Sequence, residues 1–305
     1  MNDMLFPGLQ VVERGWLSAN MVIAQGRQTA VVDTGYVRHE AQTVALVRSA
    51  FGEGGPQLLV NTHLHSDHCG GNAALQKAFP ALRTLIPPGH AAEVAAWDAY
   101  TLSYEPTGQL CPRFGFDATL TPGQELQLGD RAWQVLAAPG HDPHSVVLFE
   151  PNSRTLISAD ALWENGFGVV FPELEGLHAF AEVGATLDLI EALQPQTVIP
   201  GHGAVFGYRP EVMARARQRL ASFVSDPKRH AQHAVKVLLK YKLLEVQQQP
   251  LAEFMAWAHG TAYMQTLHTR WFAQHSMQEW LTALLADLQR VGAAQVQDGL
   301  VLNQG

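Results

Sequence analysis

The chain has 305 residues, of which 47% are apolar, and a formal net charge of −8. This length suggests about two domains with a sizeable core, and the apolar fraction is ordinary for a globular protein. No run of about 18 apolar residues occurs, which excludes a membrane-spanning helix, and two cysteines exclude a disulfide framework.

Charge is divided unevenly along the chain. Residues 1–208 hold 9 Lys and Arg against 21 Asp and Glu, a net of −12, whereas residues 209–305 hold 11 against 7, a net of +4. This shift predicts a domain boundary near Tyr208–Pro210. Binding of an anionic partner by residues 209–305 stays an open alternative. The first seven residues show no basic segment followed by an apolar one, so we expect the cytoplasm.

Short strands alternating with helices are predicted up to residue 208. Apolar or β-branched runs between turn residues predict strands, and an apolar period of 3.6 residues predicts helices. The predicted strands are Val11–Val12, Met21–Ala24, Thr29–Val32, Pro56–Val60, Thr84–Ile86, Gln124–Leu128, Ala132–Ala137, Val146–Phe149, Thr155–Ile157 and Thr197–Ile199. The predicted helices are Glu40–Phe51, Ala73–Phe79, Gly89–Ser103 and Phe180–Leu193. A long loop is predicted over Tyr104–Phe116. The order of strands and helices predicts two sheets flanked by helices.

Four potential metal ligands lie within six residues directly after a buried-type strand: His63, His65, Asp67 and His68. Alternate side chains of an extended segment point the same way, so His63 and His65 can reach one ion. A turn at Gly70-Gly71 lets Asp67 and His68 face a second position. Histidine with carboxylate suits zinc or non-haem iron, so a His-rich surface loop is the weaker interpretation.

Three further polar residues, His141, Asp160 and His202, each follow an apolar strand. Loops at the ends of strands are the usual place for functional groups. A single Asp in such a place is more often a turn or a helix cap than a ligand. Three such residues in a chain that also carries the His-rich motif favour one shared metal site.

Together these motifs resemble those of the metallo-β-lactamase superfamily, and the resemblance covers roughly residues 10–208. The motifs are His63-x-His65-x-Asp67-His68, Pro139-Gly140-His141, Ser158-Ala159-Asp160 and Pro200-Gly201-His202-Gly203. They are specific for the superfamily and weakly specific for any substrate. The resemblance implies an α+β fold, a four-layer αββα sandwich with a two-metal site at one edge between the sheets.

All seven ligands that the resemblance implies have a counterpart in this chain. The first metal would be held by His63, His65 and His141, and the second by Asp67, His68 and His202, with Asp160 bridging both. Asp33 matches the family's early acidic position and is expected to orient the ligand loop rather than to bind metal.

The resemblance also implies two zinc ions, with iron or manganese as alternatives, and a bridging hydroxide that attacks a carbonyl carbon or a phosphorus. Asp67 is the expected catalytic residue, because it can also orient the nucleophile. His65 stands where the di-iron electron-transfer branch typically has Glu, which favours a zinc hydrolase. Asp160 stands where many β-lactamases of the first subclass have Cys, which disfavours antibiotic hydrolysis.

Candidate substrate contacts are His144, Trp163 and Tyr208, which follow the predicted ligands closely in sequence. His144 lies in a turn where many family members have Gly, and a solvated turn residue explains it equally well. Core packing or loop surface is at least as good an explanation for Trp163 and Tyr208. For Cys69 we favour a small buried filler over a reactive thiol.

Residues 209–305 are predicted to be mostly helical. The predicted helices are Glu211–Val224, Lys228–Leu244, Pro250–His259 and Ser276–Val291. Asp298-Gly299 between apolar runs then predicts a hairpin. This order resembles the winged-helix-like extension of some superfamily members, so we predict a catalytic domain over 1–208 and a winged-helix-like domain over 209–305.

The predicted function is hydrolysis of an ester, a thioester or a related acyl compound, with glyoxalase II-like cleavage as one model. One alternative is an endoribonuclease or phosphodiesterase, and another is a mononuclear-iron persulfide dioxygenase. We expect a small-molecule substrate first and nucleic acid second, no membrane, and leave a homo-oligomer open. The basic residues that would meet phosphates are Arg215, Arg217, Arg219, Lys228, Arg229, Lys236, Lys240 and Lys242.

Overall fold

The computed structural model describes residues 3–305, with side chains described from residue 7 onward. The expectation of no leader segment therefore falls partly outside the described residues. Two compact units are formed: one holds the chain up to Leu102 with Leu110–Ala221, and the other holds Ser103–Gln109 with Ser222–Gly305. The predicted domain ranges differ from these units at residues 209–221 and 103–109.

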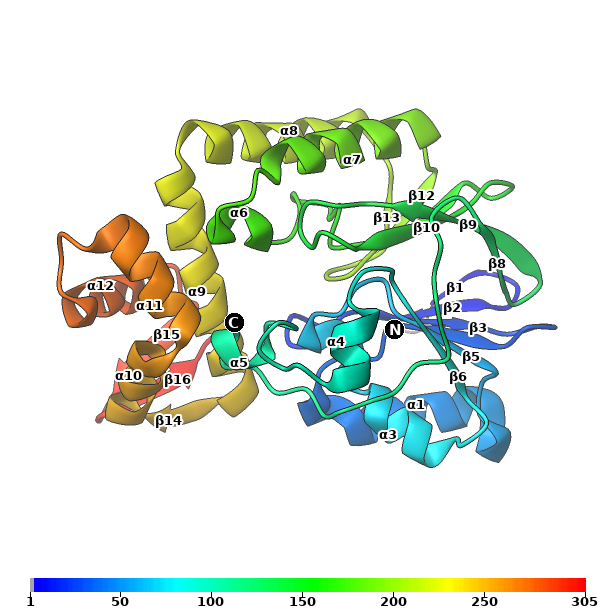
Figure 1. The fold of residues 1–305 in the computed structure, drawn as a ribbon, viewed down its shortest axis with the longest axis horizontal. Helices are drawn as coiled ribbons and strands as arrows, with labels where there is room; N and C mark the ends of the chain where they lie inside the picture. Colours follow the sequence, from blue (N-terminus) through cyan, green and yellow to red (C-terminus); the bar gives the residue numbers. More distant parts are fainter. Residues whose placement is uncertain (1–2) are drawn as a thin grey trace. The chain divides into compact units, whose positions relative to one another are not determined.

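A seven-stranded sheet in the order β1-β2-β3-β4-β5-β6-β7 forms one layer of the first unit. Strands β1 to β4 pair antiparallel, and β4 to β7 pair in parallel. The strands are β1 (Asp3–Phe6), β2 (Leu9–Val12), β3 (Met21–Ala24), β4 (Ala30–Val32), β5 (Leu58–Val60), β6 (Arg83–Ile86) and β7 (Ala118–Thr119). Helices α1 (Glu40–Phe51) and α3 (Asn72–Ala78) cover its outer face (Figure 1).

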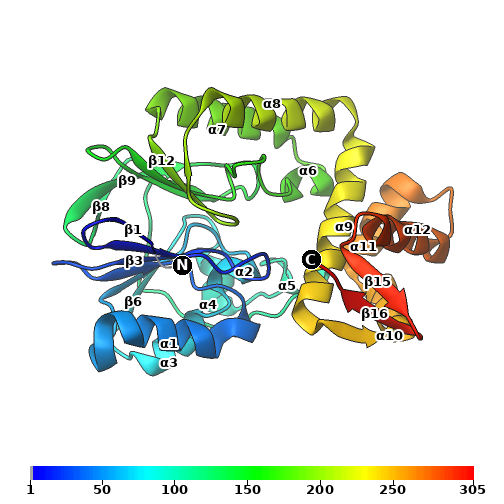
Figure 2. The same cartoon turned by 180° about the vertical axis from the view of Figure 1, so that it is seen from behind.

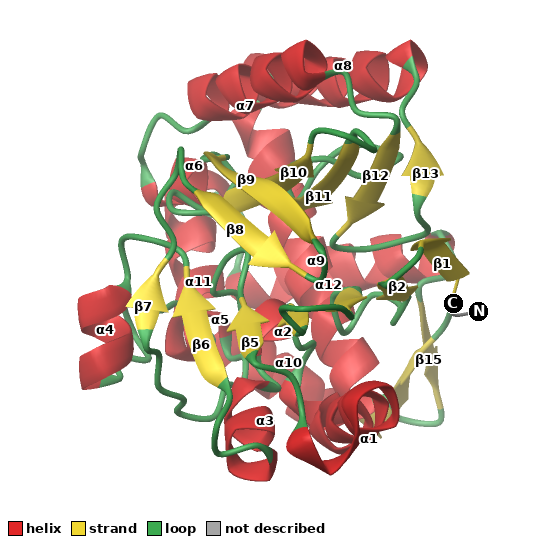
Figure 3. Ribbon diagram, turned by 90° about the vertical axis from the view of Figure 1, so that its right-hand side faces the viewer, coloured by secondary structure: helices red, strands yellow, loops and turns green. Residues whose placement is uncertain are grey.

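The second sheet of this unit has six strands in the order β13-β12-β11-β10-β9-β8. Only β11 and β12 pair in parallel. The strands are β8 (Glu125–Leu128), β9 (Arg131–Ala137), β10 (Val146–Glu150), β11 (Thr155–Ala159), β12 (Thr197–Pro200) and β13 (Phe206–Gly207). Helices α7 (Phe180–Leu193) and α8 (Pro210–Ser225) lie along its outer face, opposite α1 and α3 (Figures 2 and 3).

Alternating side chains explain why these strands lie in the middle of four layers. In β3, Val22 and Ala24 join the apolar cluster between the sheets, whereas Met21 and Ile23 join the cluster beneath α1 and α3. Trp133 of β9 is fully buried in the cluster between the sheets. Fully burying an aliphatic side chain such as Val22 stabilises a fold by about 1.5–3 kcal/mol. The predicted two-sheet sandwich flanked by helices is confirmed.

Several short elements complete the first unit around the ends of the strands. Helix α2 carries Asp67 and His68 of the first ligand motif, and α6 lies between β11 and α7 in the chain. The short helices are α2 (Ser66–Cys69), α4 (Ala91–Ala96) and α6 (Phe171–Glu175), and the 3-10 turns are Val37–His39 and Gly52–Gly54. The predicted helix Gly89–Ser103 is wrong beyond Ala96, because Trp97 adopts a left-handed conformation (φ 61°) that ends α4.

The second unit consists of helices and a small antiparallel sheet in the order β14-β16-β15. Asp298 and Gly299 both have positive φ, 51° and 76°, as a type I′ hairpin turn requires, so the predicted terminal hairpin is confirmed. Its elements are α5 (Tyr104–Thr107), α9 (Pro227–Val246), α10 (Leu251–Gly260), α11 (Ala262–Leu267), a π-helical turn (His268–Phe272), α12 (Met277–Arg290), β14 (Gln248–Pro250), β15 (Ala294–Gln297) and β16 (Leu300–Asn303). The description winged-helix-like stays a prediction. Within residues 3–305, every helix is too short or too polar to span a bilayer.

Candidate metal centre

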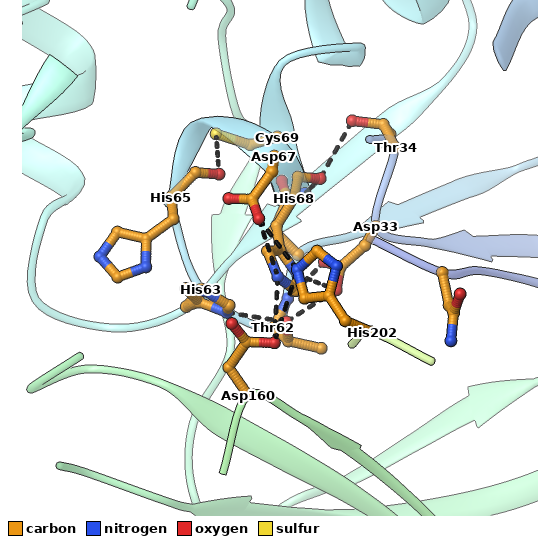
Figure 4. A network of polar contacts seen from close by, with 12 residues as sticks. Asp33, Thr34, Thr62, His63, His65, Asp67, His68, Cys69, Asp160 and His202 are labelled. Carbon is orange, nitrogen blue, oxygen red and sulfur yellow. Dashed lines mark hydrogen bonds and ion pairs between the residues drawn. The ribbon is translucent and has the colours of Figure 1, made fainter. Parts of the chain in front are cut away.

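The candidate centre lies where parallel strands of both sheets end. Strands β4 and β5 run in parallel, and Asp33 and His63 follow their carboxyl ends. Strands β11 and β12 also run in parallel, and Asp160 and His202 follow theirs. Because the carboxyl ends of parallel strands lie at the same edge of a sheet, side chains far apart in sequence converge there (Figure 4).

Three overlapping groups of potential ligands form at this edge. Within each group the ligand atoms lie within 4.8 Å of one another. The groups are His63–His65–His141, His63–His68–Asp160 and Asp67–His68–His202. The structure thus brings all seven predicted ligands together. The first and last groups match the two predicted ligand sets, and the middle group links a member of each set to Asp160.

Hydrogen bonds to the protein fix which ring nitrogen of each histidine faces the centre. The outward nitrogen contacts are His68 Nδ1 to Asp33 Oδ2 at 2.8 Å, His141 Nδ1 to Val169 O at 2.5 Å and His202 Nδ1 to Gly15 O at 3.2 Å. Such contacts orient imidazoles at metal sites. His65 has the opposite orientation, with its Nδ1 only 2.8 Å from His141 Nε2.

Buried donor atoms without partners show that these residues fit a metal ion. Within residues 3–305, the Nε2 atoms of His63 and His68 are buried and make no hydrogen bond. Leaving one such atom unpaired costs about 1–3 kcal/mol. Asp160 lies 3.4 Å from His68 Nε2 and 3.4 Å from His141 Nε2. Imidazole and carboxylate donors packed this closely suit a divalent transition metal.

Electrostatics divide the histidines into two kinds. Burial, reinforced by neighbouring histidines, lowers the pKa of His63 well below its usual value and that of His65 to about 4. Burial also lowers the pKa of His68, but Asp33 and Asp160 outweigh it, and the net pKa is raised well above the usual value. His63 and His65 are therefore held neutral, the form in which imidazole offers a lone pair to a metal.

Asp33 connects the first sheet to the ligand loop. Its carboxylate accepts hydrogen bonds from Thr62 N at 2.9 Å and Thr62 Oγ1 at 2.8 Å, besides its contact with His68 (Figure 4). Its backbone has φ 57°, a left-handed conformation that is unusual for a residue other than glycine. This turn brings the carboxylate within hydrogen-bonding distance of both Thr62 and His68, so it positions His68.

Comparison with known proteins identifies the family. Residues 14–202 match the profile of the Metallo-beta-lactamase superfamily. The chain belongs to this superfamily. A metallo-beta-lactamase family protein of Thermus thermophilus shares the fold, with a TM-score of 0.57 and 20% identity over 99% of this chain and 100% of that one.

Two curated relatives carry named activities. The chain is 30% identical over 144 residues to a hydroxyacylglutathione hydrolase of Mesorhizobium japonicum, covering 47% of each chain. It is 26% identical over 161 residues to the acyl-coenzyme A thioesterase MBLAC2 of Homo sapiens, covering 50% of this chain and 58% of that one. The chain thus spans about half the length of the curated relatives it matches.

Aromatic side chains flank both ligand groups of this superfamily member. Trp16 stacks on His202 with ring centroids 5.5 Å apart and an interplanar angle of 8°, and it remains 57% exposed. Trp163 packs edge-on against Trp16, and its Nε1 donates to Asp160 Oδ1 at 3.2 Å. Trp163 therefore lies beside the candidate ligands, and its contact with a substrate stays a prediction. Trp16 was missed, because it lies in no motif and far from His202 in sequence.

Phe171, at the start of α6, flanks the other ligand group. Its ring centroid lies 5.0 Å from that of His65 and 5.8 Å from that of His141, in edge-to-face arrangements. Sequence reasoning missed it too, because nothing in the sequence distinguishes it from a core phenylalanine. Trp16 and Phe171 thus give each ligand group an apolar neighbour.

The remaining two predicted substrate contacts have different outcomes. His144 packs edge-on against His90 with ring centroids 4.6 Å apart, in the turn that follows His141. Tyr208 directly follows β13, whose Gly207 pairs with Thr197 at the start of β12. His202 follows the opposite end of that strand, so the position of Tyr208 gives no support to a substrate contact.

Proposed function

We propose that this chain is a metal-dependent hydrolase of acyl thioesters, with zinc as the expected metal. The observation that carries the proposal is the pair of ligand groups joined through Asp160, with the buried Nε2 of His63 left without a hydrogen bond. The names of the two relatives support the choice of substrate, because one names an acyl-glutathione and the other an acyl-coenzyme A thioester.

Two divalent ions are part of this proposal. His63, His65 and His141 would hold one ion, and Asp67, His68 and His202 the other, with Asp160 between them. When bound, such ions lower the pKa of water and stabilise negative charge on a carbonyl oxygen. Iron or manganese would suit the same donors.

Asp67 and Asp160 differ in their access to solvent, which suggests different tasks. The Asp67 side chain is 15% exposed, whereas that of Asp160 is 6% exposed. Asp67 can therefore reach an incoming water and take its proton, while Asp160 holds the ligand groups together. The water oxygen bonds to the thioester carbonyl carbon, the C–S bond breaks, and the leaving sulfur receives the proton that Asp67 took, so a carboxylic acid and a thiol result.

Trp16 and Phe171 supply apolar surface for the acyl part of the substrate. Trp16 is more than half exposed although it is a large aromatic side chain. An exposed aromatic beside buried polar donors is a common arrangement in small-molecule sites, where apolar walls bind and a few polar groups orient. The acyl chain would lie on Trp16, with its carbonyl toward Asp160.

The test is a substrate panel on the full chain with its metal content measured by elemental analysis. We expect two zinc ions per chain and hydrolysis of acyl-glutathione or acyl-coenzyme A thioesters. The hydrolysis is measured as the appearance of the free thiol. The Asp160→Ala variant should lose turnover and bound metal.

RNA, a phosphodiester, a lactone and glutathione persulfide belong in the panel, because the alternative functions use the same residues. One iron per chain with oxygen uptake on the persulfide would overturn the proposal. The cytoplasm remains the expected compartment.

A further inference from the structure

The first unit brings the two cysteines of the chain together. Cys69 and Cys111 are 42 residues apart in sequence, yet their Sγ atoms lie 3.8 Å apart. Both side chains are in the thiol form. Cys69 is buried, as expected for a small filler, whereas Cys111 is partly exposed. A buried thiol in contact with a more exposed one is a pairing that the sequence did not indicate.

Anchored backbone holds both thiols in place. Cys69 is the last residue of α2, and its Sγ lies 3.3 Å from the carbonyl oxygen of His65. Cys111 belongs to the loop 110–117, where Leu110 N donates to Tyr36 Oη at 3.0 Å and Gly115 N donates to Gln76 Oε1 at 3.1 Å. The short distance between the sulfurs therefore belongs to two well-held segments rather than to a loose loop.

We propose that Cys69 and Cys111 form a dithiol modification site, which a peroxide converts to a disulfide. The S–S bond is about 2.05 Å long, so the sulfurs, now 3.8 Å apart, must approach each other by about 1.75 Å. The partly exposed Cys111 meets the oxidant first, and the buried Cys69 is placed to resolve the product. This division matches the arrangement of a sensing thiol beside a resolving one.

The reaction balances in two steps. The Cys111 thiol takes one oxygen from hydrogen peroxide, which gives a sulfenic acid and one water. The Cys69 thiol then attacks the Cys111 sulfur, the sulfenic oxygen leaves as a second water, and the S–S bond forms. Two thiols are oxidised and one peroxide is reduced, with no other reactant. Dithiothreitol reverses the product by thiol–disulfide exchange.

The disulfide would alter the metal centre, because Cys69 directly follows His68 at the end of a four-residue helix. Pulling Cys69 toward Cys111 displaces its neighbour, and a misplacement of about 1 Å in a catalytic site costs about 10²-fold in rate. The loop 110–117 takes up part of the movement that brings the sulfurs together, so His68 moves less than the sulfurs do. We therefore expect about a tenfold loss of turnover, which dithiothreitol restores. This consequence rests on the proposed hydrolase function, whereas the disulfide itself does not.

The experiment treats the metal-loaded full chain with hydrogen peroxide and then alkylates it under denaturing conditions. We expect neither cysteine to be alkylated, a peptide map that contains Cys69 linked to Cys111, and two alkylated cysteines after dithiothreitol. The Cys111→Ser variant should keep its basal activity and an alkylatable Cys69 after peroxide. Cys111→Ala replaces it if the serine variant does not fold.

Two readouts separate the site from its consequence. Cysteines that both stay alkylatable, or a Cys111 oxidised to sulfinic acid without a cross-link, would overturn the dithiol site whatever the enzyme hydrolyses. A cross-linked protein with undiminished turnover would overturn only the effect on the centre. A chain that forms the disulfide but hydrolyses no thioester would refute the proposed function and leave the site standing.

Discussion

Gly201 lies so close to the proposed ligands that adding one methyl group tests the centre directly. A Cβ at this position would lie 2.1 Å from Asp160 Oδ1 and 3.0 Å from His68 Cε1. Interiors packed at crystal density do not tolerate such contacts, so the Asp160 carboxylate in Gly201→Ala must move by about 1 Å. That carboxylate also accepts the hydrogen bond from Trp163 Nε1, which opposes the movement.

We expect Gly201→Ala to lose about 10²-fold in kcat/KM, because this is the usual cost of a misplacement of about 1 Å. Overpacking of this kind also costs about 1–3 kcal/mol of unfolding free energy. The assays are thioester hydrolysis, zinc content per chain and thermal unfolding. Gly184→Ala is the matched control, since its Cβ would meet Leu220 at an ordinary 3.8 Å. A Gly201→Ala protein with full zinc content and full kcat/KM would refute the proposed role of Asp160.

Four further outcomes are expected. Asp33→Asn should weaken zinc binding about 10–100-fold in a competition titration, because it disturbs the contact that orients His68; equal affinity would remove that role. Trp16→Ala should raise KM for a long-chain acyl thioester several-fold and leave kcat nearly unchanged, because it removes binding that substrate and transition state share. A loss in kcat alone would contradict the proposed contact between Trp16 and the acyl chain. Chelation should lower the melting temperature, and zinc at about 100 times its Kd should restore about 2.7 kcal/mol, whereas identical melting curves would argue against a bound metal. RNA binding by fluorescence anisotropy should be weak at physiological salt, and a micromolar, salt-sensitive Kd would favour the nuclease.

Regular apolar patterns made most of the fold predictable. Strands such as Met21–Ala24 are buried on both faces, so their apolar runs are continuous and easily recognised. The predicted helix from Gly89 failed beyond Ala96, since the left-handed Trp97 depends on local packing that residue type does not reveal. Two-residue strands such as β13 were missed, because pairing with a distant partner, and not sequence, defines them.

Sequence order made the meeting of the candidate ligands predictable, but not the aromatic residues beside them. His141 and Asp160 each follow a strand, so chain order alone placed them at a sheet edge. Trp16 reaches His202 only through the fold, since nearly the whole first unit separates them in sequence. The position of Tyr208 was harder to foresee, because its closeness to His202 in sequence concealed the return of the chain along β13 to the other end of β12. Short sequence distance is a guide to contact only where no strand intervenes.

The cations of the second half show why net charge was a weak guide to a phosphate partner. Arg217 donates to Asp188 at 2.7 Å and to Glu191 at 2.6 Å, and Lys242 donates to Glu245 at 2.9 Å. Exposed pairs such as those of Arg217 are worth about 0–1 kcal/mol, so a phosphate could displace them. The Lys242 pair is different, because its side chains are only 16% and 1% exposed, and breaking it would leave the Glu245 charge buried. Part of the net charge of +4 is therefore committed to the fold, so the net charge of this region does not by itself indicate a phosphate-bearing partner.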